Sequence, residues 1–272
     1  MSWMSPPKLR LVLIGWGAIA RRVAALLAER QSPVEIVGVA VRDAAVPRAG
    51  LPPGAALIDD PAHLAALRPT LVVEAAGRAS VAAWAPAALA AGADVALAST
   101  SALVDDTLRE ALVAQARACG RQLLVPPGAL GAVDALAAAS RAPLARVRHE
   151  IVKPPHAWRG TAAELLVDLE ALAAPCTFFE GSAAEAAGRF PQNANVAAIT
   201  ALAGLGLART EVALVADPAA TGNRHRVLAE GDFGRLELVL DNRALADNPK
   251  SSALTALSLV RLVENRTAPL VV

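Results

Sequence analysis

Two glycines and an alanine near the start of the chain have the spacing of a phosphate-binding turn. Gly15, Gly17 and Ala20 follow the apolar run Leu9–Ile14 and open a helix-forming segment. In a strand–turn–helix unit the first glycine permits a tight turn, the second lets the backbone approach a pyrophosphate, and the small third residue lets the helix pack on the strand. The helix N-terminus presents free N–H groups to the phosphates. The spacing predicts a dinucleotide site whose contacts are Gly15, Gly17, Ala18, Ile19 and Ala20.

The end of the second strand-like run bears on which dinucleotide such a site prefers. An acidic residue about 20 residues after the glycines binds the adenosine ribose hydroxyls of NAD, whereas an Arg nearby accommodates the 2′-phosphate of NADP. Here the run ends in Val41-Arg42-Asp43, so both residue types are present. Arg42 could meet a 2′-phosphate, Asp43 could bind the ribose, or both could be solvated loop charges. The sequence predicts NAD or NADP as cofactor and leaves the preference open.

A histidine in the second half of the chain has surroundings that suit acid–base chemistry. His225 lies in TGNRHRV (Thr221–Val227), where a turn signal leads into a strand. Imidazole changes its charge near neutral pH, and this property suits a general base. Arg224 and Arg226 alternate with His225, so in a strand they face away from it.

The other three histidines are weaker candidates for catalysis. His63 falls in an expected surface helix, and His149 alternates within a strand. His156 follows two prolines in a loop and is the second candidate for a catalytic histidine. Because a lone histidine is more often a structural or surface residue than a catalyst, spacing alone leaves the role of His225 a hypothesis.

Carboxamide side chains gather at the start of an apolar helix-like segment. Gln192, Asn193 and Asn195 lie within Gly188–Gly206, and a Phe-Pro pair precedes them. A single Asn would serve as an N-cap. Three carboxamides are more than capping requires, and they suit hydrogen bonding to a nicotinamide carboxamide or to a polar substrate.

Five motifs, in order along the chain, resemble those of the L-aspartate dehydrogenases. They are GWGAIA, PPGALGAVDAL, FPQNANVAA, TGNRHRV and NPKSSALTALSL. The resemblance implies oxidative deamination of L-aspartate with NAD or NADP, through iminoaspartate to oxaloacetate and ammonia, in pyridine-nucleotide biosynthesis. It implies a Rossmann domain, a smaller α+β catalytic domain and a homodimer. It also implies that His225 is the active-site histidine, with Asn195 and the backbone of Ala129 near the nicotinamide.

Two other classes of protein stay open beside this one. A two-domain dehydrogenase or reductase of another small acid, of the dihydrodipicolinate or homoserine type, would need a different polar set in its second half. A non-catalytic NAD(P)-sensing module would bind the cofactor without turning over an amine. The FPQNAN and TGNRHRV motifs favour the aspartate enzyme over both. Ala20 stands where the glycine motif often has Gly, and a helix–strand contact that tolerates a methyl group accommodates it.

An amino dicarboxylate substrate needs partners for two carboxylates. Burying a carboxylate without a partner is very costly, so cations or N–H donors must meet each one. The candidates that the sequence offers are Lys153, Arg159, Asn193, Arg226 and Lys250. Each could equally be a solvated surface residue, and the sequence does not rank them.

The composition argues against several other functions. The 272 residues have a net charge of +1 and scattered charges, so neither nucleic acid nor an anionic membrane is an expected partner. Cys119 and Cys176 lie far apart without flanking metal-ligand patterns, which predicts free thiols and no metal site. Because Met1–Lys8 does not resemble a signal peptide and no uninterrupted apolar stretch has membrane-spanning length, we expect a cytoplasmic protein.

The elements that must position these residues alternate between strand and helix in the first half of the chain. The expected strands are Leu9–Ile14, Val34–Val41, a short one near Leu57, Leu71–Gly77, Asp94–Thr100 and one from Gln122, with helices between them. Alternation of this kind predicts right-handed crossovers and a doubly wound parallel sheet. We expect an α/β dinucleotide-binding Rossmann domain over residues 1–128.

The pattern changes after Gly131. The segments RVRHEIVKP, VALVADP, RHRVLAEG and RLELVLDNR have the polar alternation of an antiparallel sheet with one wet face. Helices are expected over 161–174 and 194–207, and a last amphipathic helix would have Ser251 or Ser252 as its N-cap. We expect a smaller α+β domain for catalysis and dimerisation over 129–248, with the C-terminal segment 249–272 packing back on the first domain.

Overall fold

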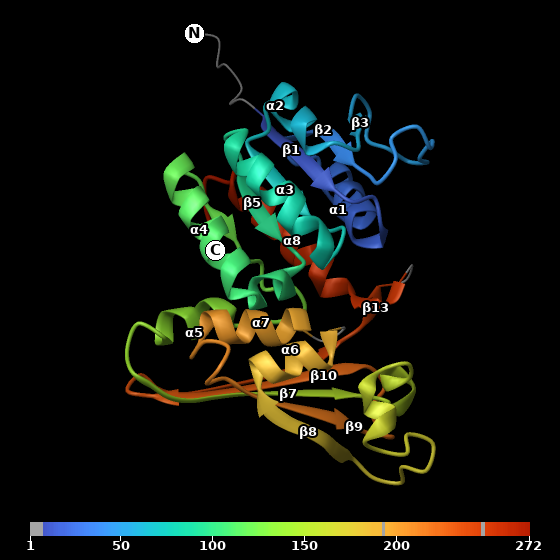
Figure 1. Cartoon of the computed structure of the whole chain (residues 1–272), viewed down its shortest axis with the longest axis vertical. Coiled ribbons are helices and arrows are strands. Elements are labelled where there is room, and N and C mark those ends of the chain that lie inside the picture. The colour runs from blue at the N-terminus through green and yellow to red at the C-terminus, as the bar shows by residue number, and fades with distance from the viewer. Residues whose placement is uncertain (1–7, 192–193, 246–247) are drawn as a thin grey trace. The chain divides into compact units, whose positions relative to one another are not determined.

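The computed structural model describes residues 8–191, 194–245 and 248–272. The chain forms two compact units, which Figure 1 shows. The first contains the chain up to Pro126 and again Ala256–Val272, and the second contains Pro127–Thr255. The first unit is therefore built from both ends of the chain, and the second is continuous.

A six-stranded parallel sheet forms the centre of the first unit. Its strand order is β3-β2-β1-β4-β5-β6, and every pairing is parallel, as the alternation predicted. The strands are β1 (Leu9–Ile14), β2 (Val34–Ala40), β3 (Ala56–Ile58), β4 (Leu71–Glu74), β5 (Asp94–Leu97) and β6 (Leu123–Leu124). In this doubly wound order the chain reverses direction across the sheet between β1 and β4, and dinucleotides bind at that point.

Helices cover both faces of this sheet. They are α1 (Ala18–Glu29), α2 (Leu64–Leu67), α3 (Arg78–Ala90), α4 (Asp106–Cys119) and α8 (Ala253–Asn265), with short 3-10 turns η1 (Pro61–His63) and η2 (Thr100–Val104). One face packs against α3 and α4 through side chains such as Trp84 and Leu112. The other packs against α1 and α8 through Leu27 and Leu259. No helix among the described residues has both the length and the apolar character needed to cross a membrane.

Capping residues mark the helix ends where the sequence indicates them. The Asp105 carboxylate accepts a hydrogen bond from the Leu108 N–H at 3.1 Å and begins α4, and Gly120 ends that helix in the left-handed region at φ +62°. Ser252 is the cap of α8, because its hydroxyl oxygen accepts from the Leu254 N–H at 3.1 Å. Local hydrogen bonding therefore sets these boundaries.

The second unit contains a mixed five-stranded sheet in the order β11-β10-β7-β9-β8. Its strands are β7 (Leu144–Lys153), β8 (Cys176–Ser182), β9 (Glu211–Ala216), β10 (Asn223–Gly231) and β11 (Gly234–Asn242). A separate hairpin pairs β12 (Ala244–Leu245) with β13 (Asn248–Ser252). The helices are α5 (Val133–Ala139), α6 (Ala183–Arg189) and α7 (Ala194–Ala203), with 3-10 turns η3 (Pro155–Trp158) and η4 (Ala162–Leu165). Figure 1 shows α5, α6 and α7 along one face of the sheet.

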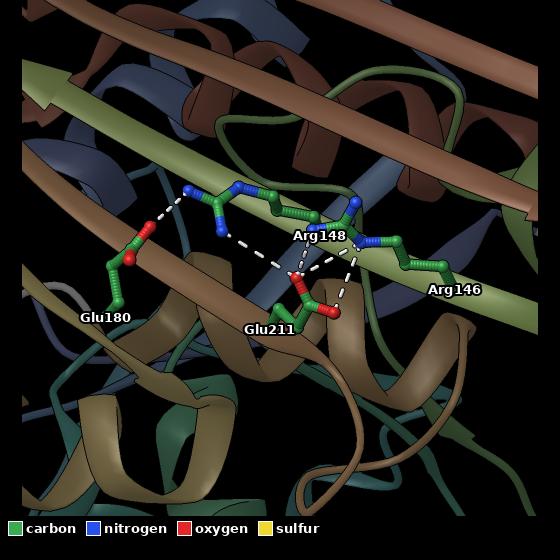
Figure 2. Close-up of polar contacts among 4 residues, drawn as sticks. All are labelled: Arg146, Arg148, Glu180 and Glu211. Atoms are coloured by element: carbon green, nitrogen blue, oxygen red, sulfur yellow. Dashed lines mark hydrogen bonds and ion pairs between the residues drawn. The ribbon is translucent and has the colours of Figure 1, made fainter.

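Alternate residues of each strand face opposite sides of this sheet. On β7, Val147 and Ile151 belong to the buried clusters beneath the helices. Arg146 and Arg148 point the other way and form ion pairs with Glu211, and Arg148 also pairs with Glu180 (Figure 2). These pairs are partly exposed, so each stabilises the fold by about 1 kcal/mol or less. The face away from the helices is the wet face that the alternation predicted.

Some expectations for the second unit are wrong. The sheet is not purely antiparallel, because β7 and β9 run parallel. The connection between them contains β8, α6 and α7 and is long enough for a crossover. The sequence patterns did not identify α5, α6, β8 or the β12–β13 hairpin, and α7 ends at Ala203, short of position 207.

The helix expected over 161–174 is also wrong, because only the turn η4 forms there. The Asp168 carboxylate accepts hydrogen bonds from the backbone N–H groups of Glu170 and Ala171 at 3.1 and 3.3 Å. Such local side-chain bonds offer the backbone an alternative to helical pairing. They hold a turn in a segment whose composition favours a helix.

Candidate active site

The glycine turn lines a pocket of about 610 Å³ in the first unit, at the end of β1. Gly15 has φ +94°, and a Cβ there would lie 2.9 Å from the Cα of Ala76. Only glycine therefore fits between β1 and the turn after β4. Gly17 is the N-cap of α1, with no side-chain hydrogen bond and open space where its Cβ would be. The first N–H groups of α1 are thus accessible to a phosphate from that side.

The remaining motif residues support the turn from behind. Ala20 is buried in the cluster that joins α1 to the sheet, so the third motif position is a packing contact that accommodates a methyl group. Ala18 and Ile19 are half-buried in the first turn of α1. Such a turn, open towards the pocket and closely packed behind, fits the pyrophosphate of a dinucleotide.

A buried carboxylate shapes the opposite wall of the pocket. Glu74, at the end of β4, accepts hydrogen bonds from the backbone N–H groups of Ala76 and Gly77 at 2.8 and 2.9 Å. It also accepts from the hydroxyls of Ser80 and Ser99 at 2.8 and 3.1 Å. These bonds fix the turn between β4 and α3 that faces the glycine motif. The motifs did not indicate this role of Glu74, although an acidic residue within an apolar strand is the signal that could have identified it.

Basic side chains line the pocket beyond the end of β2. Arg42 and Arg48 both lie in its wall, and in the described part of the chain neither forms a hydrogen bond or an ion pair. Asp43 does not line the pocket, and its carboxylate accepts from the Ala45 N–H at 2.9 Å. Asp59 lines it, and its carboxylate accepts from the Ala44 N–H at 2.9 Å. The groups available to a ligand here are predominantly cationic.

A second polar cluster lies in the second unit, between the sheet and α7. His225 on β10 is 3% exposed, His149 on β7 is 0% exposed and Thr200 on α7 is 1% exposed. The His225 Nδ1 lies 3.1 Å from the His149 Nε2, and the His149 Nδ1 lies 2.9 Å from the Thr200 Oγ1. The Thr200 hydroxyl donates to the carbonyl of Val196 at 3.1 Å. Three polar side chains therefore form one buried hydrogen-bonded chain.

Lys153 and His225 influence each other electrostatically in this cluster. Burial lowers the pKa of Lys153 to about 8, and its ammonium lies 5.0 Å from the ring centre of Trp158. Burial, with a contribution from the Lys153 charge, lowers the pKa of His225 to about 3. Burial, with a contribution from His225, also lowers the pKa of His149 well below its usual value. Both imidazoles are therefore neutral near pH 7, beside an ammonium group that titrates close to that pH.

Other predicted residues lie apart from this cluster. Arg226 faces the wet side of the sheet and pairs with Glu237 at 2.7 Å, and Arg159 pairs with Glu170 at 2.6 Å. Of the histidines, His63 is exposed in η1, and the exposed His156 lines a different hollow beside the turn before β10. Gln192, Asn193 and the side chain of Lys250 lie outside the described residues. The structure brings Lys153 to His225 and separates Arg159 and Arg226 from it.

The two residues predicted near the nicotinamide both lie in the second unit. The carbonyl of Ala129 accepts a hydrogen bond from the Asn242 side-chain amide at 2.8 Å, and Asn242 pairs across the sheet with Asn223. Asn195 is exposed in the first turn of α7. Asn242 thus links the segment that contains Ala129 to the start of β10, two residues before His225.

The chain is similar to curated L-aspartate dehydrogenases over nearly its whole length. It is 57% identical to the L-aspartate dehydrogenase of Brucella anthropi, over 96% of this chain and 98% of that protein. It is 43% identical to the enzyme of Ruegeria pomeroyi, over 98% of this chain and 96% of that one. The chain belongs to the L-aspartate dehydrogenase family. The family model "Aspartate dehydrogenase, C-terminal" matches residues 134–266, and "Homoserine dehydrogenase, NAD binding domain" matches residues 15–126.

The comparison with solved structures also finds an aspartate dehydrogenase. The crystal structure of the aspartate dehydrogenase from Thermotoga maritima has a TM-score of 0.77 and 26% identity, and the match covers 97% of this chain and 99% of that one. An amine dehydrogenase from Mycobacterium smegmatis has a TM-score of 0.56 and 17% identity, over 96% and 92% of the two chains, and shares the fold. Membership of the L-aspartate dehydrogenase family, a Rossmann-type unit and a second unit with a mixed sheet are thus established together.

Proposed function

We propose that this member of the family catalyses the NAD(P)-dependent oxidative deamination of L-aspartate, through iminoaspartate, to oxaloacetate and ammonia. The observation that carries the proposal is the pair His225 and Lys153, a buried neutral base beside a half-buried cation, in a chain 57% identical to an L-aspartate dehydrogenase. A hydride acceptor, a base and a cation for a carboxylate are what this reaction requires. The resemblance also implies a role for this reaction in pyridine-nucleotide biosynthesis.

When bound, the cofactor would supply the redox chemistry as the acceptor of a hydride from the substrate Cα. The substrate amine must be neutral before the hydride leaves, so that its nitrogen lone pair can form the C=N bond. We assign the removal of that proton to His225. His225 then passes this proton to solvent and is neutral again. Water adds to the imine carbon, and His225 takes a proton from this water and returns it to the nitrogen, which leaves as ammonia as the carbonyl forms. Among the described residues, His225 is the neutral base in this cluster with a ring nitrogen left over after its bond to His149.

Binding of the substrate would raise the pKa of His225 towards the range in which it can act as a general base. A base with a pKa of about 3 is too weak for proton transfer near neutral pH. A bound dicarboxylate places two negative charges near the imidazole and offsets the charge of Lys153, and opposite charges stabilise the imidazolium. The pKa of His225 therefore rises when L-aspartate binds. In the free enzyme the same histidine stays neutral, because burial and the charge of Lys153 keep its pKa low.

We assign Lys153 to one substrate carboxylate. Burial disfavours the charged form of its ammonium and lowers its pKa, and a substrate carboxylate beside it would favour the charged form. Arg226 and Arg159 already hold carboxylates of their own chain, so they are weaker candidates. Asn193 and Lys250 stay candidates for the second carboxylate, on the sequence alone.

We propose that the first unit holds the cofactor, with the pyrophosphate on Gly15, Gly17 and the start of α1, and that NADP is preferred over NAD. Arg42 and Arg48 line the adenosine end without partners in the described chain, and two guanidinium groups suit a 2′-phosphate. Asp43 lies outside the pocket wall, and Asp59, the acidic residue in that wall, accepts from the Ala44 N–H, so the two arginines outweigh it as partners for the ribose end. In the second unit, Asn195 and the backbone of Ala129 would meet the nicotinamide end, as the resemblance implies.

We also propose a homodimer that acts in the cytoplasm. The family resemblance implies the dimer. Cys119 and Cys176 are free thiols, and Cys119 is exposed, which suits a reducing compartment. Size-exclusion chromatography with light scattering tests the dimer, and a monomeric mass at micromolar concentration would contradict it.

A spectrophotometric assay tests the proposed reaction. Purified protein is mixed with L-aspartate and NADP or NAD, and separately with oxaloacetate, ammonia and the reduced cofactor, while the absorbance of the reduced cofactor is followed. We expect turnover in both directions and none with homoserine. No absorbance change with L-aspartate or oxaloacetate would contradict it, and activity on another small acid would redirect it.

A further inference from the structure

The hydrogen-bonded chain behind His225 has a direction that its donors and acceptors determine. The Thr200 hydroxyl has one proton, which it donates to the Val196 carbonyl one helical turn earlier, at 3.1 Å. Its oxygen can then only accept from the His149 Nδ1, 2.9 Å away. A neutral His149 with its proton on Nδ1 has a lone pair on Nε2. That lone pair accepts from the His225 Nδ1 at 3.1 Å, so the second nitrogen of His225, Nε2, is left without a proton.

The geometry that creates this chain comes from three separate elements. In the pairing of β10 with β7, His225 lies opposite Ile151 and Val227 lies opposite His149. The two histidines are therefore diagonal neighbours on the face of the sheet that α7 covers, and Thr200 comes from α7 itself. All three side chains are at most 3% exposed, so water does not compete for their hydrogen bonds.

We propose that His149 and Thr200 are positioning residues, which hold His225 in the tautomer with Nδ1 protonated and so present Nε2 as the basic nitrogen. This inference rests on the proposed function for the identity of the base, whereas the tautomer itself is a property of the free protein. His149 orients the imidazole ring of His225. The hydrogen bond from the His225 Nδ1–H to the lone pair of His149 becomes stronger when His225 takes a proton at its Nε2. Thr200 in turn prevents His149 from adopting the opposite tautomer.

The surroundings of His149 suit this supporting role and leave it no direct part in the reaction. Both of its ring nitrogens are committed, one to Thr200 and one to His225. The titratable groups on its side of the sheet, among the described residues, are His225 on β10 and Lys153 further along β7, while β9 contributes the apolar Val212 beside it. No carboxylate of the described chain is hydrogen-bonded to either ring, so the neutral imidazole takes the place that an acidic residue holds in a Ser-His-Asp triad.

Variants that keep or remove the acceptor test the proposal through kcat. His149→Leu removes the acceptor with little change in volume, and His149→Gln keeps an amide oxygen near the position of Nε2. We expect the Leu variant to lose about 10–100-fold in kcat, the usual scale for an outer-shell partner, with KM for L-aspartate and Kd for NADPH within about twofold. The Gln variant should recover most of the rate. Thr200→Val should lose about 3–10-fold by the same reasoning, and Thr200→Ser should match the wild type.

The tautomer can be observed without substrate or turnover. Long-range ¹H–¹⁵N spectra of the histidine rings at pH 7 should show His225 protonated on Nδ1, and His149→Leu should give a mixture of tautomers. A wild-type His225 protonated on Nε2, or equal kcat values for the Leu and Gln variants, would overturn the proposal. If the protein instead fails to oxidise L-aspartate while the predicted tautomer is present, the proposed function fails and the hydrogen-bond assignment stands. The Thr200→Val and Thr200→Ser variants should both have near-native melting temperatures. A difference in kcat between them then does not arise from misfolding.

Discussion

Removal of the two pocket arginines should change the cofactor preference of this protein. Arg42 is exposed and Arg48 is half-buried in the wall of the pocket beyond β2. A buried charge-assisted hydrogen bond contributes about 1.5–3 kcal/mol, and solvent screening reduces this towards about 1 kcal/mol for an exposed side chain. Arg42→Ala should therefore raise the Kd for NADPH about 5-fold, and the double variant with Arg48→Ala about 30–100-fold.

The expected change is specific to the 2′-phosphate, so NADH is the internal control. The Kd for NADH should stay within about twofold in both variants, because NADH has a hydroxyl at that position. Arg22→Ala removes an arginine of α1 that pairs with Glu29 and does not line the pocket, and it should leave both constants unchanged. Trp16 and Trp84 line the pocket, so quenching of tryptophan fluorescence reports binding. Equal weakening of NADPH and NADH, or unchanged NADPH binding in the double variant, would refute the reasoning.

Three further predictions follow from the same structure. Gly15→Ala should lower the free energy of unfolding by about 2–4 kcal/mol and abolish cofactor binding, because its Cβ meets backbone at 2.9 Å with φ +94°. Gly17→Ala has open space and should keep the wild-type melting temperature while it weakens NADPH binding at least about tenfold, since its methyl group enters the phosphate position; equal melting temperatures for both variants would contradict this pair. Lys153→Met should raise the KM for L-aspartate at least about tenfold, because the variant has no charge to meet the carboxylate. In the wild type kcat/KM should fall as the pH rises through about 8, where Lys153 loses its charge; a flat profile above pH 8 would exclude Lys153 as the carboxylate partner. The pKa values of His149 and His225 are lowered in the native state, so below about pH 6.5 the unfolded chain binds protons that the native state does not. The free energy of unfolding should therefore fall with decreasing pH, by up to about 1.4 kcal/mol per pH unit for each histidine. Urea denaturation at pH 7, 6 and 5 measures this slope, and His225→Asn should reduce it; an unchanged slope would contradict the assignment.

The Rossmann unit could be predicted from the sequence because its signals are local. Gly15 and Gly17 lie within a few residues of the strand and the helix that they join, and Asp105 and Gly120 mark the two ends of α4. Each of these residues acts on backbone that is adjacent in the sequence. Continuous apolar runs then require a sheet that is covered on both faces.

The histidine chain could not be predicted, because it depends on pairings between distant segments. His149 and His225 are 76 residues apart, and Thr200 is 51 residues from His149. Only the register of β7 with β10, together with the placement of α7, makes them neighbours, and a shift of one residue would turn His225 to the wet face. Lys153 was one of five open candidates for the same reason.

The segment over 161–174 illustrates a limit of composition as a guide. Its Ala, Leu and Glu residues have high helix propensity, and propensity is a weak preference that tertiary contacts override. Ala163 and Leu169 are instead buried in the cluster around Trp158, which the turn at Asp168 permits. Local propensity and burial conflict there, and burial determines the structure.

The most direct test of the central claim compares wild type with His225→Ala in one assay of L-aspartate oxidation. The wild type should release one oxaloacetate and one ammonia for each cofactor reduced. The variant should lose about 10²–10⁴-fold in kcat, the scale of a general base, while its Kd for NADPH is unchanged. Turnover of L-aspartate by His225→Ala at a rate near that of the wild type would contradict the assignment of His225 as the base.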